Sequence, residues 1–532
     1  MRRIGIVGAG LSGLVTAKTL LEEGCEVVVW EKEAEPGGVW ARSRRYPGVA
    51  TQNPRDTYAF SDFPMPASYP EWPRGEQVQA YLAAYADRFG VTPRLRLGTR
   101  VDAAREREGA PGWTVETTVV EGPDAGTRET HEVDFLVVCS GVFSAPHVPR
   151  FPGREAFEAA GGRVLHTTEL HDAAEVEGRR VLVVGYAKSA CDVAAAVAER
   201  ARECTLLYRR AHWKMLKRWF GFVPLRFVLT TRAAESLFRY RRPAGVERAL
   251  HTVGRPAVWL FWRGVEMHLR RAHRLRECGL VPEDRVEQVV GCSLSLETDG
   301  FFEAVRSGRL RTTRGEPARF VEGGVELESG ERVDADVVVF GTGFRQEVPF
   351  LAEPARGRVV DGEGVFRLYR NILPPEVPGL AFIGYNSSLY SQLTSEVGAR
   401  WLAEHLRGAL SLPPAEEMHR EIAERWEWIR RERPRGAAGG TCIIPFTFHY
   451  LDDLLRDMGA RTVRSRNLLA EFLLPVNPAL YADLAAELAA KRQLRDPAKV
   501  WAGRVVGEPE PGAGPRGGGG RGGRGRGPPA AG

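Results

Sequence analysis

A glycine-rich turn near the start of the chain has the residue types that bind the diphosphate of a dinucleotide. GAGLSG, residues 8–13, follows the apolar run IGIV and precedes an apolar-periodic segment. In such a turn Gly8 permits the sharp bend, Gly10 lets the backbone approach a diphosphate, and Gly13 lets the helix pack closely on the strand. The N-terminus of the following helix supplies unpaired N–H groups for the phosphates.

An acidic residue follows this first turn at the spacing that recognises a ribose. Glu31 ends the next expected strand, about 20 residues after the glycines. A carboxylate there accepts hydrogen bonds from a ribose 2′-hydroxyl and repels a 2′-phosphate, so the site suits a dinucleotide without that phosphate. The residues that we expect to contact it are Gly8, Ala9, Gly10, Leu11, Ser12, Gly13, Glu31 and Lys32.

A second strand–turn–helix pattern, VLVVGYAKSACD, lacks two of the three glycines. It keeps the first glycine but has alanine at 187 and 190. Alanine is still small, so a phosphate can approach, while the lysine and serine between the two alanines add a cation and a hydroxyl at the start of the helix. We therefore predict a second dinucleotide site at Gly185, Ala187, Lys188, Ser189 and Ala190.

Two arginines follow the next expected strand, where a site for NAD would have an acidic residue. These are Arg209 and Arg210, and an arginine at this point suits a 2′-phosphate, which favours NADPH over NADH. The alternative is that both arginines only begin a solvated run of basic residues.

EPGGVW, residues 35–40, places a glycine pair and Trp40 shortly after Glu31. In flavoproteins with this fold such a glycine pair lies over the diphosphate, and Trp40 is placed to close over the cofactor. With six further motifs in the same order, the chain resembles the flavin-containing monooxygenases from about residue 1 to 430. The motifs are GAGLSG, GGVW, YPGVATQNPRDTYAFSDFP, GYAKSACD, FGTGF, LYRNILPP and EVGARW.

The resemblance implies FAD at the first turn and NADPH at the second. NADPH would reduce FAD, dioxygen would add at flavin C4a, and the hydroperoxide would give one oxygen atom to the nitrogen of an amine or the sulfur of a sulfide. Such chemistry needs little acid–base machinery, and the histidines show no metal-like pairing. The partners are then a small-molecule substrate and dioxygen, with no metal. The resemblance adds as expected cofactor contacts Gly38, Val39, Trp40, Thr51, Gln52, Asn53, Arg55, Thr342 and Gly343.

Two segments depart from the family pattern. In TQNPRDTYAFSDF, Gln52 stands where the family often has asparagine near the flavin and nicotinamide, and Arg55 stands at its lysine. Gln52 keeps an amide on a longer arm, and Asn53 is the alternative, so these two are the candidate catalytic residues. In AGGRVLHTTEL, residues 160–170, the glycine and histidine of a family fingerprint are kept, but alanine and leucine replace its aromatic residues.

This second departure disfavours, without removing, a Baeyer–Villiger monooxygenase. An NADPH oxidase that releases peroxide would need the same two cofactors. The non-enzymatic alternative is a flavin-binding protein without turnover, such as a redox sensor or a membrane-surface protein.

The elements that must position these residues predict an α/β fold with two Rossmann-like domains, the second inserted in the first. Strands are expected at 3–7, 26–30, 181–184, 204–208 and within 333–344, and helices at 11–23, 75–89, 188–200, 393–407 and 415–432. The expected domains are 1–150 and 331–450 for FAD, 151–330 for NADPH with a helical insert at 211–280, a helical extension at 451–507, and a disordered tail at 508–532.

The insert has a strong excess of positive charge. Residues 209–276 hold seventeen Lys and Arg against three Asp and Glu, with ten aromatics, so the rest of the chain is net −8 within a total of +6. The insert is expected either to roof the substrate cavity or to contact an anionic membrane surface. Nucleic-acid binding is disfavoured because no recognition module accompanies the charge. With no signal-peptide pattern and no apolar run of about 18 residues, we expect a cytoplasmic protein, peripheral at most to a membrane.

Overall fold

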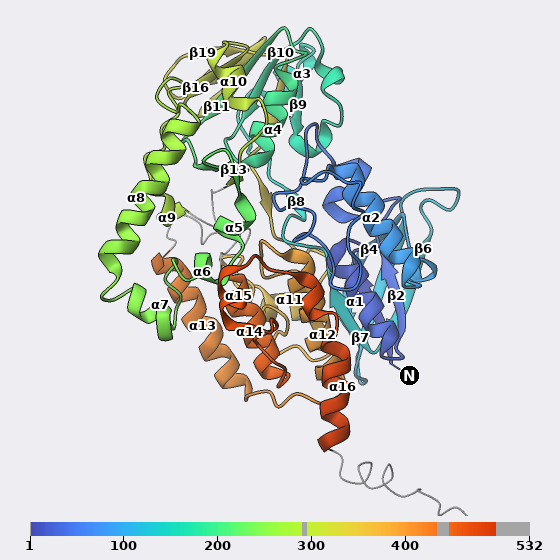
Figure 1. Ribbon diagram of the computed structural model, residues 1–532. Coiled ribbons are helices and arrows are strands. Elements are labelled where there is room, and N and C mark those ends of the chain that lie inside the picture. Colours follow the sequence, from blue (N-terminus) through green and yellow to red (C-terminus); the bar gives the residue numbers. More distant parts are fainter. Residues whose placement is uncertain (1, 290–294, 433–445, 496–532) are drawn as a thin grey trace, which may run out of the picture. The chain divides into compact units, whose positions relative to one another are not determined.

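The protein is described by a computed structural model of residues 2–289, 295–432 and 446–495 (Figure 1). It divides into two compact units, Met1–Asp483 and Leu484–Gly532. Within its described residues the second unit contains one helix, α16 (Leu484–Arg495). The tail predicted to be disordered, 508–532, lies outside the described residues. All that follows concerns the first unit.

The first sheet has five parallel strands in the order β22-β7-β1-β2-β3. Its strands are β1 (Arg3–Val7), β2 (Glu26–Trp30), β3 (Leu95–Arg96), β7 (Phe135–Val138) and β22 (Leu380–Phe382). The helices that accompany it include α1 (Leu11–Glu22), α2 (Gly75–Arg88) and α12 (Ser391–Leu406). β1, β7 and β22 are almost wholly buried, as the continuous apolar runs of a parallel sheet require. α1 and α12 lie side by side (Figure 1).

The second sheet is also parallel and has the order β16-β11-β10-β20-β9. Its strands are β9 (Arg163–His166), β10 (Arg180–Val184), β11 (Glu203–Tyr208), β16 (Leu310–Arg314) and β20 (Val337–Phe340). Helix α4 (Lys188–Val197) connects β10 to β11. β20 begins after residue 330, the expected end of the second domain, yet it pairs with β10 and β9. The chain therefore returns to the first sheet only after Phe340.

The two linkers between the sheets pair with each other. β8 (Ala145–Pro146) lies on the way to the second sheet, β21 (Phe344–Arg345) lies on the way back, and the two form a short antiparallel ladder. Two further sheets are antiparallel and three-stranded. They comprise β4 (Thr99–Glu106), β5 (Trp113–Val119) and β6 (Arg128–Val133), and β17 (Pro317–Val321), β18 (Gly324–Leu327) and β19 (Arg332–Asp334).

The insert predicted at 211–280 is helical only in part, and it extends to residue 306 because the second sheet resumes only with β16. It starts with β12 (Lys214–Met215), β13 (Arg218–Trp219) and β14 (Val223–Pro224), followed by α5 (Leu225–Leu229), α6 (Arg232–Glu235), α7 (Gly245–Leu250), α8 (Arg255–Ala272), α9 (Val286–Val289), β15 (Ser295–Leu296) and α10 (Phe301–Arg306). β12 is a strand because it pairs in parallel with β15, which follows α9 along the chain. α8 buries Val258, Trp262, Val265 and Leu269 at helical spacing.

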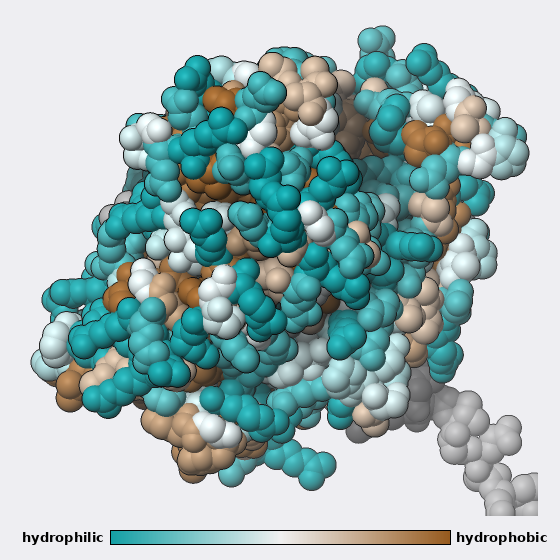
Figure 2. All heavy atoms as spheres, turned by 90° about the horizontal axis from the view of Figure 1, so that it is seen from above, coloured by the Kyte–Doolittle hydropathy of each residue, from teal (hydrophilic) through white to brown (hydrophobic). Residues whose placement is uncertain are grey.

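The other helices complete the first unit. They are α3 (Arg154–Ala159), α11 (Ala355–Val359), α13 (Ala415–Glu432), α14 (Thr447–Asp457) and α15 (Leu468–Leu473), with short 3₁₀ turns that include Gly38–Trp40 and Arg42–Arg44. The view in Figure 2 is largely hydrophilic, with scattered apolar side chains.

Candidate functional site

The first turn has the geometry that its glycines predicted. Gly8 has a φ of +104°, and its N–H donates to the Trp30 carbonyl at 2.8 Å. A Cβ on Gly13 would lie 1.9 Å from the Gly8 carbonyl oxygen, so only glycine lets α1 approach β1 this closely. The turn therefore presents the N-terminus of α1 at the end of β1.

Glu31 lies directly beside this turn. Its carboxylate accepts hydrogen bonds from the N–H groups of Ala9 at 2.7 Å and Glu33 at 3.0 Å. Burial raises the pKa of Glu31, while these two N–H donors oppose that rise. Each carboxylate oxygen has a further lone pair, so the group can still accept a ribose hydroxyl. Lys32 points its ammonium toward Glu33 instead, 3.8 Å away.

The GGVW segment crosses the mouth of the first turn. A Cβ on Gly38 would lie 3.1 Å from the Cα of Gly10, so the two glycine backbones are in near contact. The Trp40 ring is buried and meets the Tyr58 ring edge-on, with centroids 5.9 Å apart. Val39 is more exposed than Trp40. This is where a glycine pair was expected to cover a diphosphate.

The N-terminus of α12 meets the same region. Ser12 on α1 and Ser395 on α12 are hydrogen-bonded through their hydroxyls at 2.9 Å. The buried side-chain donors Nε1 of Trp40 and Nε2 of Gln392 lie near the Tyr58 hydroxyl but make no hydrogen bond of ordinary geometry with the described residues. Buried donors without a partner are costly unless a ligand satisfies them. The carbonyl oxygens and ring nitrogens of an isoalloxazine are acceptors of the right kind, so these residues fit a flavin.

The second turn repeats the backbone of the first. Gly185 has a φ of +132°, and its N–H donates to the Leu207 carbonyl at 2.8 Å, as Gly8 does to Trp30. Gly341 has the position that Cys139 has in the first sheet, because each donates its N–H to the carbonyl of the last residue of the turn strand, at 2.8 Å in both cases. The two turns thus correspond residue by residue.

This correspondence explains the missing third glycine. A Cβ on Gly341 would lie 2.5 Å from the Cβ of Ala190, so the alanine methyl fits only because residue 341 has no side chain. In the first turn the limiting contact is different, because a Cβ on Gly13 would meet the Gly8 carbonyl oxygen at 1.9 Å, whereas Cys139 Cβ would lie at an ordinary contact distance of 3.5 Å.

The cation predicted at this turn is already paired. Lys188 forms an ion pair with Asp192 one helical turn away, and its Nζ donates to the Thr298 hydroxyl at 3.2 Å. Asp192 is buried and also accepts from Thr298 Oγ1 at 2.5 Å. Ser189 stands beside Lys188 in the first turn of α4, and Ala187 is its N-cap residue. Lys188 therefore holds the insert to α4 and does not stand as an isolated charge.

Arg209 and Arg210 follow β11 and are exposed on the protein surface. The Arg209 side chain is 70% exposed, and its only ion pair among the described residues is with Glu316 at 3.6 Å. After the end of β20, Thr342 donates to the His147 carbonyl, and the Gly343 carbonyl accepts from the His147 N–H at 3.0 Å. Thr342 and Gly343 thus hold the two linkers together.

The loop with the candidate catalytic residues joins three parts of the first unit. Gln52 Oε1 accepts the Leu296 N–H of the insert at 3.2 Å, whereas Asn53 Nδ2 donates to the Leu389 carbonyl, just before α12, at 2.8 Å. The Thr51 hydroxyl donates to the Asn53 carbonyl at 2.8 Å and fixes the bend between them. Arg55 donates to the Tyr69 carbonyl within the same loop. Gln52 and Asn53 therefore bind different parts of the molecule.

Comparison with known proteins identifies the family to which this fold belongs. Residues 1–480 match the model of a family described as flavin-binding monooxygenase-like. The chain belongs to that family. It is 29% identical over 511 residues to a probable flavin-containing monooxygenase 1 of Arabidopsis thaliana. This match covers 89% of this chain and 94% of the relative. It is 28% identical over 481 residues to dimethylaniline monooxygenase [N-oxide-forming] 2 of Rattus norvegicus, covering 87% and 83%.

Solved structures share the fold. S-allyl-L-cysteine S-oxygenase from Allium sativum gives a TM-score of 0.57 at 20% identity and covers 94% of each chain. Cyclohexanone monooxygenase from Rhodococcus bound to NADP⁺ gives 0.63 at 18% identity, covering 86% of this chain and 97% of that one. As a member of the flavin-binding monooxygenase-like family, the chain is a flavin-dependent monooxygenase that uses FAD and NADP, with a two-domain Rossmann-type fold.

Two charged residues, half-buried Glu396 and buried Lys18, support the loop that holds Gln52 and Asn53, although sequence reasoning did not single them out. Glu396 on α12 accepts from the Ser61 N–H at 2.9 Å and from its hydroxyl at 2.5 Å, and Lys18 on α1 pairs with Asp62. Burial raises the pKa of Glu396 to about 7. The motifs FSDF and EVGARW contain three of these residues, so the family resemblance was the available signal.

The altered fingerprint at 160–170 is built into the packing. Leu170 is fully buried in the same core cluster as residues of β10 and α4, and a Cβ on Gly162 would strike the Phe157 ring. His166 is buried as well, with Nε2 3.1 Å from the Gly343 carbonyl. His166 thereby fixes the linker that leads from the second sheet back to the first, so its role is to position that linker.

Two further findings concern metals and membranes. Over residues 2–289, 295–432 and 446–495, no group of three or more His, Cys, Asp or Glu side chains is arranged to hold a metal ion. Over the same ranges we find no helix whose length and apolar character would carry it across a bilayer.

Proposed function

We propose that this monooxygenase uses NADPH and dioxygen to add one oxygen atom to a soft nucleophile, an amine nitrogen or a sulfide sulfur, in a small organic molecule. The observation that carries the proposal is the junction at residues 51–53. There one loop contacts the segment that leads into α12 and, through Leu296, the insert of the second sheet. A reductant from one site and a flavin from the other would meet at such a junction.

We propose that the charged residue beside each turn determines which of the two cofactors binds there. The carboxylate of Glu31 at the first turn suits the unphosphorylated ribose of FAD, and exposed Arg209 after the second suits the 2′-phosphate of NADPH. Trp40 and Gln392 would donate to the flavin ring. Bound FAD supplies the transfer of two electrons from NADPH to dioxygen, so that one oxygen atom is added to the substrate and the other leaves as water.

The protein residues in this scheme orient and enclose rather than exchange protons. The Leu296 N–H donates to Oε1 of Gln52 and so fixes the plane of the side-chain amide. The Nε2 group of Gln52 therefore remains as a donor with a fixed direction. Asn53 is committed to Leu389, so Gln52 is the residue proposed to donate to the reacting oxygen. An enclosed site with a fixed donor and little acid–base machinery suits a nucleophilic substrate that attacks oxygen directly. The names of an N-oxide-forming relative and an S-oxygenase neighbour support the same substrate class.

A Baeyer–Villiger reaction on a ketone is the alternative. The fold shared with cyclohexanone monooxygenase supports it, whereas the alanine and leucine in the 160–170 fingerprint disfavour it. An NADPH oxidase would need the same cofactors but would return both oxygen atoms as peroxide.

One sequential experiment tests the proposal. NADPH added to the holoenzyme without oxygen should bleach the flavin absorbance, and NADH at the same concentration should do so more slowly. Oxygen is then admitted with a tertiary amine, a sulfide or a ketone, in separate runs. The proposal expects oxygenated amine or sulfide equal to the NADPH consumed. Ketone-derived ester alone would indicate the alternative, and peroxide equal to NADPH with every substrate would indicate an oxidase.

The insert also supports peripheral contact with an anionic membrane, which we propose as its second role. On α8, Trp259, Leu260, Phe261 and Met267 are exposed by two fifths or more, although the helix also buries a full apolar face. Arginines such as Arg271 flank these side chains. Apolar and basic side chains exposed together suit a headgroup interface. Cosedimentation with phosphatidylserine vesicles should be weakened by salt and by Leu260→Glu, and equal recovery without vesicles would contradict it.

A further inference from the structure

A buried lysine lies beneath the second dinucleotide turn. Lys214, the first residue of β12, is only 2% exposed although it belongs to the basic insert. Its Nζ donates to the Tyr186 carbonyl at 2.8 Å and to the Ser295 hydroxyl at 2.9 Å. Burying a lysine is costly unless its ammonium is satisfied, so its place at this turn requires a reason.

The first turn shows what that reason is. Because Gly8 corresponds to Gly185, Ala9 corresponds to Tyr186. The Ala9 carbonyl accepts the N–H of Gly37, at 3.0 Å, from the segment that follows β2. Lys214 lies in the segment that follows β11, which is the same place in the second domain. Its side chain thus replaces, at the Tyr186 carbonyl, the backbone N–H that binds the corresponding carbonyl of the first turn.

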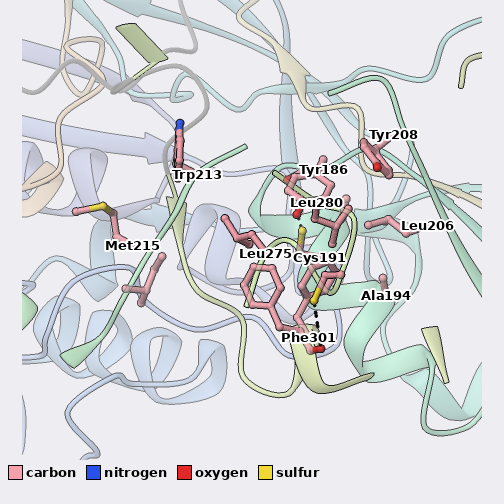
Figure 3. Packing of buried hydrophobic residues seen from close by; sticks show 14 of the residues in the cluster. Tyr186, Cys191, Ala194, Leu206, Tyr208, Trp213, Met215, Leu275, Leu280 and Phe301 are labelled. Carbon is pink, nitrogen blue, oxygen red and sulfur yellow. Dashed lines mark hydrogen bonds between the residues drawn. The ribbon is translucent and has the colours of Figure 1, made fainter. Parts of the chain in front are cut away.

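Tyr186 is fixed at its other end as well. Its ring is buried in the core with Tyr208 and Phe301, at centroid distances of 5.3 and 6.0 Å, and Cys191 Sγ donates to its carbonyl at 3.4 Å (Figure 3). The Lys214 ammonium also lies 5.0 Å from the centre of the Tyr186 ring. With ring and carbonyl both held, the peptide that follows Tyr186 has one orientation.

The charges around Lys214 also favour an anion at the second turn. Lys188 is neutralised by Asp192, whereas the two hydrogen-bond acceptors of Lys214 are a carbonyl and a hydroxyl, both neutral. Burial lowers the pKa of Lys214, and the carboxylate near it, Asp192, is already paired with Lys188. An anion at the adjacent turn would therefore favour the protonated ammonium of Lys214. The N–H groups at the start of α4 give that anion hydrogen bonds.

We propose that Lys214 is a positioning residue of the nicotinamide-dinucleotide site, which fixes the Tyr186 peptide and, as the ammonium, attracts the diphosphate. The proposal rests on the assignment of NADPH to the second turn. It differs from the role proposed for Arg209, since the diphosphate is common to NADP⁺ and NAD⁺ and the 2′-phosphate is not.

The test is the dissociation constant of the oxidised holoenzyme for NADP⁺ and for NAD⁺, measured by calorimetry. Lys214→Met keeps the apolar stem and should weaken both ligands by the same factor, about tenfold to a hundredfold, since it removes a buried charged donor. Lys214→Gln keeps a donor without charge and should have an intermediate effect. Arg209→Ala should weaken NADP⁺ alone. FAD content and melting temperature should stay near those of the parent in Lys214→Gln.

Three outcomes would overturn the inference, each for a different reason. Unchanged dissociation constants in both Lys214 variants, while Arg209→Ala still weakens NADP⁺, would remove Lys214 from the site but leave the assignment of the turn. Loss of FAD in proportion to the loss of NADP⁺ affinity would make Lys214 a general structural residue. If neither Arg209→Ala nor the Lys214 variants change NADP⁺ binding, the assignment of the second turn itself fails.

Discussion

The close approach of Gly341 to Ala190 in the second turn makes a sharp prediction for Gly341→Ala. The new methyl would lie 2.5 Å from Ala190 Cβ, 2.9 Å from its Cα and 3.1 Å from its N, so α4 or the end of β20 must move. Overpacking of this kind costs about 1–3 kcal/mol. Because the displaced atoms form the turn itself, much of that cost should appear in NADP⁺ binding, as about a fivefold to hundredfold weaker affinity.

A second substitution at Ala190 tests whether the contact between residues 341 and 190 causes the loss of affinity. Ala190→Gly alone should cost about 1 kcal/mol of stability, mainly through helix propensity, and should leave NADP⁺ affinity near that of the parent. The double variant Gly341→Ala with Ala190→Gly removes the 2.5 Å contact between the two methyls but keeps the contacts with the Cα and N of residue 190, so it should recover part of the affinity. Calorimetric titration of the oxidised holoenzyme with NADP⁺ measures all three.

The first turn provides the matched control. Gly13→Ala should abolish FAD retention, because its methyl would lie 1.9 Å from a backbone oxygen of Gly8, and Cys139→Gly should not restore it. If the second-turn double variant binds NADP⁺ no better than Gly341→Ala alone, the account of the missing glycine is refuted. Parent-like NADP⁺ affinity in Gly341→Ala would refute it too.

Three further predictions concern other parts of the site and its support. Arg209→Ala should raise the KM for NADPH at least about tenfold and leave the KM for NADH unchanged, whereas Arg319→Ala, at another exposed ion pair, should change neither; equal effects on both coenzymes would contradict a 2′-phosphate contact. Gln392→Leu should lower FAD affinity severalfold at unchanged melting temperature of the apoprotein, because it removes a buried donor that makes no hydrogen bond of ordinary geometry with the described residues; full FAD retention would show that the flavin does not use it. Burial lowers the pKa of His449, but its hydrogen bonds with two carboxylates outweigh this and raise it to about 9; its stabilising contribution, on the order of 3 kcal/mol, is therefore complete below about pH 6.5 and lost as pH rises through 9, and His449→Gln should show a melting temperature that falls less over that range than the parent's.

The first turn was predictable because its chemistry is local. The bend at Gly8, the approach at Gly10 and the acidic residue at 31 all lie within one βαβ unit, and each requires a particular residue type. The order of the motifs supplied the family, which the match over residues 1–480 confirms. The two parallel sheets follow from the same apolar runs.

The features that sequence reasoning missed depend on residues far apart in the chain. Ala190 is tolerated because of Gly341, and β20 joins the second sheet because it pairs with β10, neither of which a local pattern contains. β12 is a strand only through its pairing with β15. Lys214 was one of seventeen basic residues in its stretch, so nothing in the sequence distinguished a buried lysine from the solvated ones. Only the pairing of Lys188 with Asp192, one helical turn apart, was open to a sequence argument.

Isotope tracing with ¹⁸O₂ tests the proposed function most directly. The holoenzyme is given limiting NADPH, a tertiary amine or a sulfide, and ¹⁸O₂ in ordinary water. We predict that the N-oxide or sulfoxide carries the heavy isotope and equals the NADPH consumed. Product with oxygen from water, or NADPH consumption with labelled peroxide and no oxygenated substrate, would contradict the proposed oxygen transfer.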